Sequence, residues 1–85
     1  MEWNIQFDSR VIKDMKKIDE PVKRRIWESI NNMLEKPETA DIKKLKGKAS
    51  EYRLRVGDWR VRFQVDYTRK TYFVTHVKHR RDIYS

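Results

Sequence analysis

The stretch EYRLRVGDWRVRFQVD, residues 51–66, alternates polar and apolar side chains on both sides of the dipeptide Gly57-Asp58. A two-residue loop that opens with glycine is a strong β-hairpin signal, because glycine adopts the positive φ that a type II′ turn requires at its first central position. The turn then fixes which residues face one another across the two strands. These pairs are Val56 and Trp59, Arg55 and Arg60, Leu54 and Val61, Arg53 and Arg62, and Tyr52 and Phe63.

Side chains alternate across a strand, so this hairpin is predicted to have one apolar face and one basic face. The apolar face holds Tyr52, Leu54, Val56, Trp59, Val61 and Phe63, and the basic face holds Arg53, Arg55, Arg60 and Arg62. Like charges directly opposite one another cost roughly 0.2–1 kcal/mol per pair. Two interpretations remain: a solvated outer face, or a preorganised site for a polyanion, since the planar donor fork of arginine matches a phosphate.

Length and composition restrict the class of protein. The 85 residues are enough for a single domain, 1–85, and 21 Lys and Arg against 13 Asp and Glu give a net charge of +8. This excess favours nucleic acid, an anionic membrane surface or an acidic protein as partner. The chain has no cysteine and two histidines, and no apolar run long enough to span a bilayer. We therefore expect a soluble cytoplasmic protein with no disulfide, metal, cofactor or membrane partner.

The first part of the chain predicts a strand followed by two helices. Residues 1–7 alternate as a half-buried strand does, and Asp8 or Ser9 can cap the helix that follows. Its apolar stripe comprises Val11, Ile12, Met15 and Ile18. Asp19 caps a second helix, which ends before Pro37. Its stripe comprises Val22, Ile26, Trp27, Ile30, Met33 and Leu34.

The remaining segments complete the predicted fold. Residues 37–50 are expected to form an irregular loop, either solvated or in contact with phosphate through Lys43, Lys44, Lys46 and Lys48. Residues 71–78 form a last strand with two possible core faces, one with Phe73, Thr75 and Val77 and the other with Tyr72 and Val74. The fold is predicted to be α+β, with a helical hairpin packed on one face of a small, largely antiparallel sheet. The arginines lie on the open face of this sheet.

Several segments together resemble the RelE/ParE superfamily of toxins from type II toxin–antitoxin systems, and within it the RelE branch. They are the opening strand with the helix DSRVIKDMKKID, then IKKLKG, YRLRVGDWRVRFQV and the terminal VKHRRDIYS. The resemblance spans nearly the whole chain and depends on the order and spacing of these segments. It implies a compact RelE-like domain that an antitoxin protein neutralises. In the RelE branch it also implies ribosome-dependent cleavage of mRNA in the decoding site.

The resemblance also implies a set of site residues. The basic cluster of the RelE branch falls on Arg53, Arg55, Arg60 and Arg80, and its C-terminal tyrosine falls on Tyr84; Arg62 and His79 lie beside these positions. The chain departs from the family pattern by placing arginines where lysines stand at the first two positions. Arginine does not lose its proton in proteins, so a base role carried by lysine there does not transfer.

Cleavage of RNA by its own 2′-hydroxyl needs a base, cations around the phosphate and an acid for the leaving 5′ oxygen, with no metal. The arginines supply the cations. Tyr84 could transfer a proton or stack on a base, and His79 is another candidate proton carrier, whereas we expect His76 to be a solvent-facing or packed strand residue. Two other functions remain open. One is inhibition of DNA gyrase, as in the ParE branch, and the other is RNA binding without catalysis.

Overall fold

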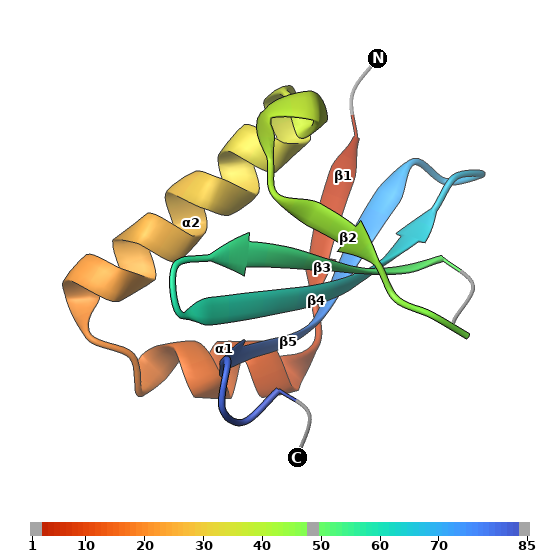
Figure 1. Cartoon of the computed structure of the whole chain (residues 1–85). Helices are drawn as coiled ribbons and strands as arrows, with labels where there is room; N and C mark the ends of the chain where they lie inside the picture. Colours follow the sequence, from red (N-terminus) through yellow and green to blue (C-terminus); the bar gives the residue numbers. More distant parts are fainter. Residues whose placement is uncertain (1–2, 48–49, 84–85) are drawn as a thin grey trace.

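The computed structural model describes residues 3–47 and 50–83. Within these ranges the elements are β1 (Asn4–Phe7), α1 (Ser9–Lys16), α2 (Glu20–Glu35), the 3-10 turn η1 (Pro37–Thr39), β2 (Ile42–Lys44), β3 (Glu51–Val56), β4 (Trp59–Asp66) and β5 (Thr71–His79). One sheet runs in the order β1-β5-β4-β3-β2, with β1 parallel to β5 and the other neighbours antiparallel. Figure 1 shows α2 lying across the sheet and α1 beside β5. The predicted α+β fold is confirmed.

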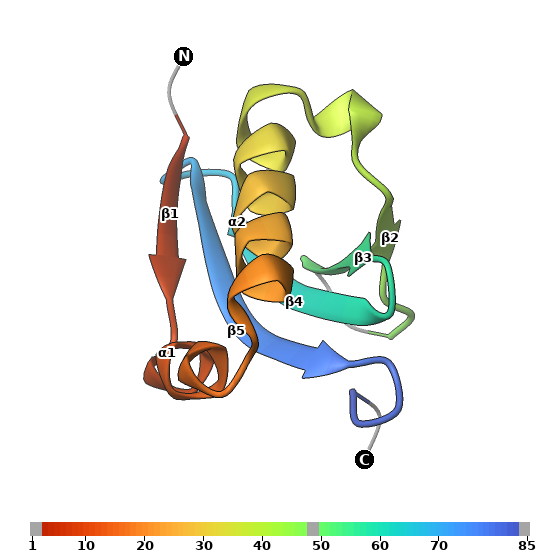
Figure 2. The same cartoon turned by 90° about the vertical axis from the view of Figure 1, so that its left-hand side faces the viewer.

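The core lies between the helices and one face of the sheet. Ile26, Ile30 and Met33 of α2 are buried, as are Val11 and Met15 of α1. They pack against buried strand residues, namely Leu54, Val56, Val61, Phe63, Val65, Val74 and Val77. Figure 2, turned by 90°, shows α2 upright against the sheet and α1 nearly end-on below it. We call the sheet face toward α2 the core face and the opposite one the open face.

The β3–β4 hairpin has the predicted register at every pair, from Tyr52 opposite Phe63 to Val56 opposite Trp59. Gly57 has a φ of +58°, whereas Asp58 is not among the residues with positive φ, as a type II′ turn requires. The turn therefore places the apolar residues on the core face and the arginines on the open face.

Helix starts follow the sequence signals, but two residues of the predicted apolar stripes are exposed. Asp8 caps α1 by accepting a hydrogen bond from the backbone N–H of Arg10 at 2.9 Å, and Asp19 occupies the N-cap position of α2. Ile12, expected in the apolar stripe of α1, is 53% exposed, and Trp27, expected in that of α2, is 36% exposed. Both predictions were wrong, because α1 turns only Val11 and Met15 toward the core, and α2 turns only the line of Ile26, Ile30 and Met33.

The described residues of the segment 37–50 are more regular than expected. The segment contains η1 and the short edge strand β2, in which Ile42 pairs with Leu54 and Lys43 with Arg53. The strand β2 forms because its backbone pairs with β3. The sequence does not indicate it, because three residues are too few to show an alternating pattern. The expectation of an irregular loop was therefore wrong for residues 37–39 and 42–44.

Each of the two core faces predicted for the last strand is correct over one part of β5. Arg62 pairs with His76 but Phe63 pairs with Val74, so Thr75 is an extra residue in β5, which makes a β-bulge. Before the bulge Val74 faces the core; after it Val77 does, and both are buried. The bulge thus reverses the alternation of β5 halfway along the strand.

Candidate functional site

Cations gather on the open face in two rows that cross the strands. The first row, here called the basic row, consists of cross-strand partners in β2, β3, β4 and β5, namely Lys43, Arg53, Arg62 and His76. The second row lies one step nearer the Gly57 turn and consists of Arg55, Arg60 and Lys78. The structure therefore brings together the hairpin arginines, as predicted. It adds Lys78 and His76 of β5 to them.

Carboxylates contact some of these cations at the border of the site. Glu51 Oε1 lies 3.6 Å from Arg62 Nη2, and both side chains are 19% exposed. Asp14 of α1 lies 3.0 Å from Lys78 Nζ, and Asp58 lies 3.8 Å from Arg80 Nε. The ion pairs of the exposed side chains contribute little to stability, typically about 0–1 kcal/mol.

Arg60 differs from the other arginines of the open face. Its Nη1 donates to the backbone carbonyls of Gly57 at 2.7 Å and Trp59 at 2.9 Å. This guanidinium therefore fixes the hairpin turn. Arg55, its cross-strand neighbour, is exposed to solvent.

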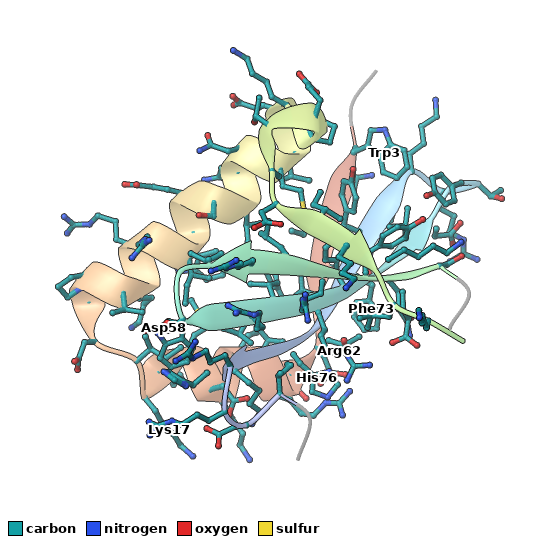
Figure 3. All side chains as sticks on the ribbon, viewed as in Figure 1. Trp3, Lys17, Asp58, Arg62, Phe73 and His76 are labelled. Atoms are coloured by element: carbon teal, nitrogen blue, oxygen red, sulfur yellow. The ribbon has the colours of Figure 1, made fainter. Side chains whose placement is uncertain are left out.

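One end of the basic row opens into a hollow of about 380 Å³ between α1, the open face and the C-terminal segment. It is lined by five cations, one histidine, two carboxylates and an isoleucine, namely Arg10, Lys13, Lys17, Arg62, Lys78, His76, Asp14, Asp82 and Ile83. Figure 3 shows Arg62 and His76 next to each other at this end of the sheet. Cations outnumber carboxylates around the hollow, so its charge suits an anionic ligand.

His76 is half-buried in this hollow, and its environment disfavours the imidazolium. Burial lowers the pKa of His76 below 6.5, and the nearby cations Arg10, Arg62 and Lys78 lower it further, against the opposing carboxylate of Asp8. Its Nδ1 lies 3.0 Å from Thr75 Oγ1. His76, which the sequence predicted to be a solvent-facing or packed strand residue, therefore lies at the end of the basic row. In the sequence, residues 71–78 allow two alternative core faces. This ambiguity is the signal that could have revealed the bulge and the orientation of His76.

His79 lies elsewhere. It is opposite Trp59, a core-face residue, and the two rings meet edge-on with centroids 5.5 Å apart. It lines a neighbouring hollow with Trp59 and Val77, which shares Asp14 and Lys78 with the first hollow but not Arg62 or His76. The structure therefore does not bring His79 together with the basic row.

The other predicted site residues have separate positions. Lys44 is opposite Tyr52 and so lies on the other side of β2 from Lys43, and Lys46 is exposed after the strand. Arg80 is exposed at the turn end of the site, where its backbone N–H donates to the carbonyl of Asp58 at 2.8 Å. Lys48 and Tyr84 lie outside the described residues.

The described residues include neither a group placed to hold a metal ion nor a helix that could span a membrane. Over residues 3–47 and 50–83, no group of three or more His, Cys, Asp or Glu side chains is placed to hold a metal ion. In the same part of the chain, neither α1 nor α2 is long and apolar enough to cross a membrane.

The chain is similar in sequence to known toxin proteins. The model of the family described as the ParE toxin of the type II toxin–antitoxin system parDE matches residues 5–84. The RelE1 protein of Methanocaldococcus jannaschii is 30% identical over 87 residues, which covers 99% of this chain and 97% of that protein.

Solved structures of RelE proteins have the same fold. The chain matches RelE of the archaeal RelE–RelB complex from Pyrococcus horikoshii with a TM-score of 0.79 and 27% identity, over 94% of this chain and 97% of that one. It matches the isolated E. coli RelE toxin with a TM-score of 0.76 and 25% identity, over 91% of this chain and 83% of that one. The chain therefore belongs to the RelE/ParE superfamily of toxins from type II toxin–antitoxin systems, near the RelE branch.

Proposed function

We propose that this toxin is a ribosome-dependent endoribonuclease, which cleaves mRNA in the decoding site by attack of the RNA 2′-hydroxyl without a metal. The observation that carries the proposal is the arrangement of Lys43, Arg53 and Arg62 as direct cross-strand partners on an open sheet face. Such a row can hold successive phosphates of a single strand and stabilise charge that grows on the one being cleaved.

The residues of the proposed site have different roles. Arg53, Arg55 and Arg62 bind and neutralise phosphates, and Arg80 extends the site at its turn end. Arg60 contributes its charge but also supports the turn through its bonds to Gly57 and Trp59. Contacts away from the cleaved phosphate come from the lysine-rich segment, with Lys43, Lys44, Lys46 and Lys48. The family resemblance implies Tyr84 and His79 as proton carriers; of these we retain Tyr84, because His79 lies opposite Trp59 and away from the basic row.

The proposed partners are the ribosome with its mRNA and a cognate antitoxin protein. Relatives of similar fold were solved as RelE–RelB complexes, which supports an antitoxin partner for this chain. A net charge of +8 favours an antitoxin whose contacting segment is acidic, because complementary charge speeds association and selects partners. This chain is expected to act in the cytoplasm, where ribosomes are found.

The test is to induce the toxin and map mRNA 5′ ends on and off ribosomes, with Tyr84→Phe beside the wild type. We expect cuts within ribosome-bound codons, and a loss of about 10²–10⁴-fold in single-turnover cleavage by Tyr84→Phe, because the change removes a hydroxyl and keeps the ring. Cleavage near the wild-type rate by Tyr84→Phe would exclude proton transfer by Tyr84. An absence of cuts from the wild type would overturn the endoribonuclease function.

Inhibition of DNA gyrase is the second candidate, because the matching family model is that of ParE toxins. A supercoiling assay with purified gyrase separates the two functions. Under the endoribonuclease proposal, the toxin leaves supercoiling unchanged at concentrations that stop translation.

A further inference from the structure

A β-bulge turns His76 toward the open face. Val74 faces the core, and strict alternation would place His76 on the same side two residues later. The extra residue Thr75 changes this, so that His76 pairs with Arg62 at the end of the basic row while Val77 enters the core. Bulges commonly redirect a side chain next to an active site. The fold thus departs from regular pairing at the one point that brings an imidazole beside the arginines.

Hydrogen bonds through Thr75 determine which ring nitrogen of His76 carries a proton. Thr75 Oγ1 lies 3.3 Å from the carbonyl oxygen of Arg62, to which it can only donate, since a carbonyl only accepts. A hydroxyl has one hydrogen, so Thr75 Oγ1 must accept from His76 Nδ1 at 3.0 Å. This leaves Nε2 of the neutral ring with its lone pair available.

From this geometry, and on the basis of the endoribonuclease function proposed above, we propose that His76 is the general base that takes the proton of the attacking 2′-hydroxyl. Its Nε2 belongs to a ring that lines the same hollow as Arg62, Lys78 and Arg10. The base and the phosphate-binding cations would then act on one nucleotide.

His76 Nε2 takes the 2′ proton, the 2′ oxygen bonds to phosphorus, and the bond from phosphorus to the 5′ oxygen breaks. The 5′ oxygen takes a proton from a second group, for which Tyr84 is the candidate. The products are a 2′,3′-cyclic phosphate and a 5′-hydroxyl, and both protein groups regain their protonation states by exchange with water.

The charges around His76 favour the neutral ring that this role requires. Arg62 on β4, Lys78 on β5 and Arg10 on α1 act on its charge, and Lys13 of α1 and Lys17 after it line the same hollow; the carboxylates are Asp8, Asp14 and Asp82. Asp14 is engaged by Lys78 at 3.0 Å, and Asp8 by Arg10 at 3.1 Å. Burial and these surrounding cations therefore lower the pKa of His76 below 6.5, which favours the neutral ring that accepts a proton.

The chain offers a matched control, since it has two histidines and His79 lies on the Trp59 side of β5. The experiment measures single-turnover cleavage of mRNA on programmed ribosomes from pH 5 to 8 for wild type, His76→Gln and His79→Gln. We expect His76→Gln to lose about 10²–10⁴-fold at neutral pH and to lose the acidic limb of the pH profile. His79→Gln should keep that limb. Circular dichroism and ribosome binding show whether each variant is folded.

A second measurement does not depend on activity. Long-range ¹⁵N NMR of the two histidine rings identifies the tautomer of each. We expect the Nδ1–H form for His76 at neutral pH, shifted toward the Nε2–H form in Thr75→Val. Cleavage by His76→Gln within a few-fold of wild type, or an Nε2–H tautomer in the wild type, overturns this inference while the endoribonuclease function stands. A wild-type toxin that does not cleave overturns both.

Discussion

The core face and the open face of the β3–β4 hairpin use the same two strands in opposite ways. On the core face, Leu54, Val61 and Phe63 are at most 2% exposed and pack under α2. On the open face, Arg53 faces Arg62 and Arg55 faces Arg60. The first face lowers the free energy of the folded state, whereas the second raises it by repulsion. Alternation along a strand therefore lets the chain keep a binding surface that disfavours folding beside a core that favours it.

The largest effect on stability is expected from Phe63→Ala. Phe63 is 2% exposed, and its ring lies 5.7 Å from those of both Tyr52 and Tyr72. Truncating a buried phenylalanine costs about 3–5 kcal/mol, a large share of the roughly 5–15 kcal/mol that holds a small domain folded. Chemical denaturation measures the change. Gln64→Ala, the next residue and an exposed one on the other face, is the control and should stay within about 0.5 kcal/mol.

A smaller loss is expected from Gly57→Ala, which affects both faces because this turn sets their register. Gly57 has a φ of +58°, and an added Cβ would lie 3.1 Å from the guanidinium nitrogens of Arg25. A non-glycine residue at positive φ costs about 1–3 kcal/mol. Gly47→Ala is the matched control, since its φ is +73° and nothing lies within 4 Å of its added Cβ. Equal losses for the two variants would contradict a specific contribution from the Arg25 contact.

The hairpin and β5 show how far the sequence predicts this site. Gly57 fixes the hairpin through local backbone geometry, so the positions of Arg53 and Arg62 follow from the chain alone. Lys43 joins them only through pairing of β2 with β3, which no local pattern indicates. His76 joins them through a bulge whose only trace is a break in alternation. Contacts made by α1 depend on tertiary packing. Such packing leaves no periodic pattern in the local sequence from which it could be predicted.

For Arg55→Gln we expect no loss of stability, in contrast to the losses expected from Phe63→Ala and Gly57→Ala. Arg55 is exposed and faces Arg60, and like charges directly opposite cost roughly 0.2–1 kcal/mol. We therefore expect the free energy of unfolding to stay equal or rise by up to about that amount, while toxicity on induction largely disappears. Glutamine keeps most of the length of the side chain and removes its charge. A variant that unfolds more easily than wild type would show that Arg55 supports the fold, and the contrast between the faces would fail at this position.

The smallest change in stability is expected when the pH is varied. Burial and the cations around His76 lower its pKa in the folded state, whereas in the unfolded chain the pKa is about 6.5. Between these two values the unfolded state binds the extra proton, so stability rises as the pH is raised through this window and levels off above about 6.5. Denaturation midpoints across the window measure the slope. His76→Gln should flatten it and His79→Gln should not, because only His76 lies among the cations of the open face. A slope unchanged in His76→Gln would mean that the open face imposes no proton-linked cost on folding.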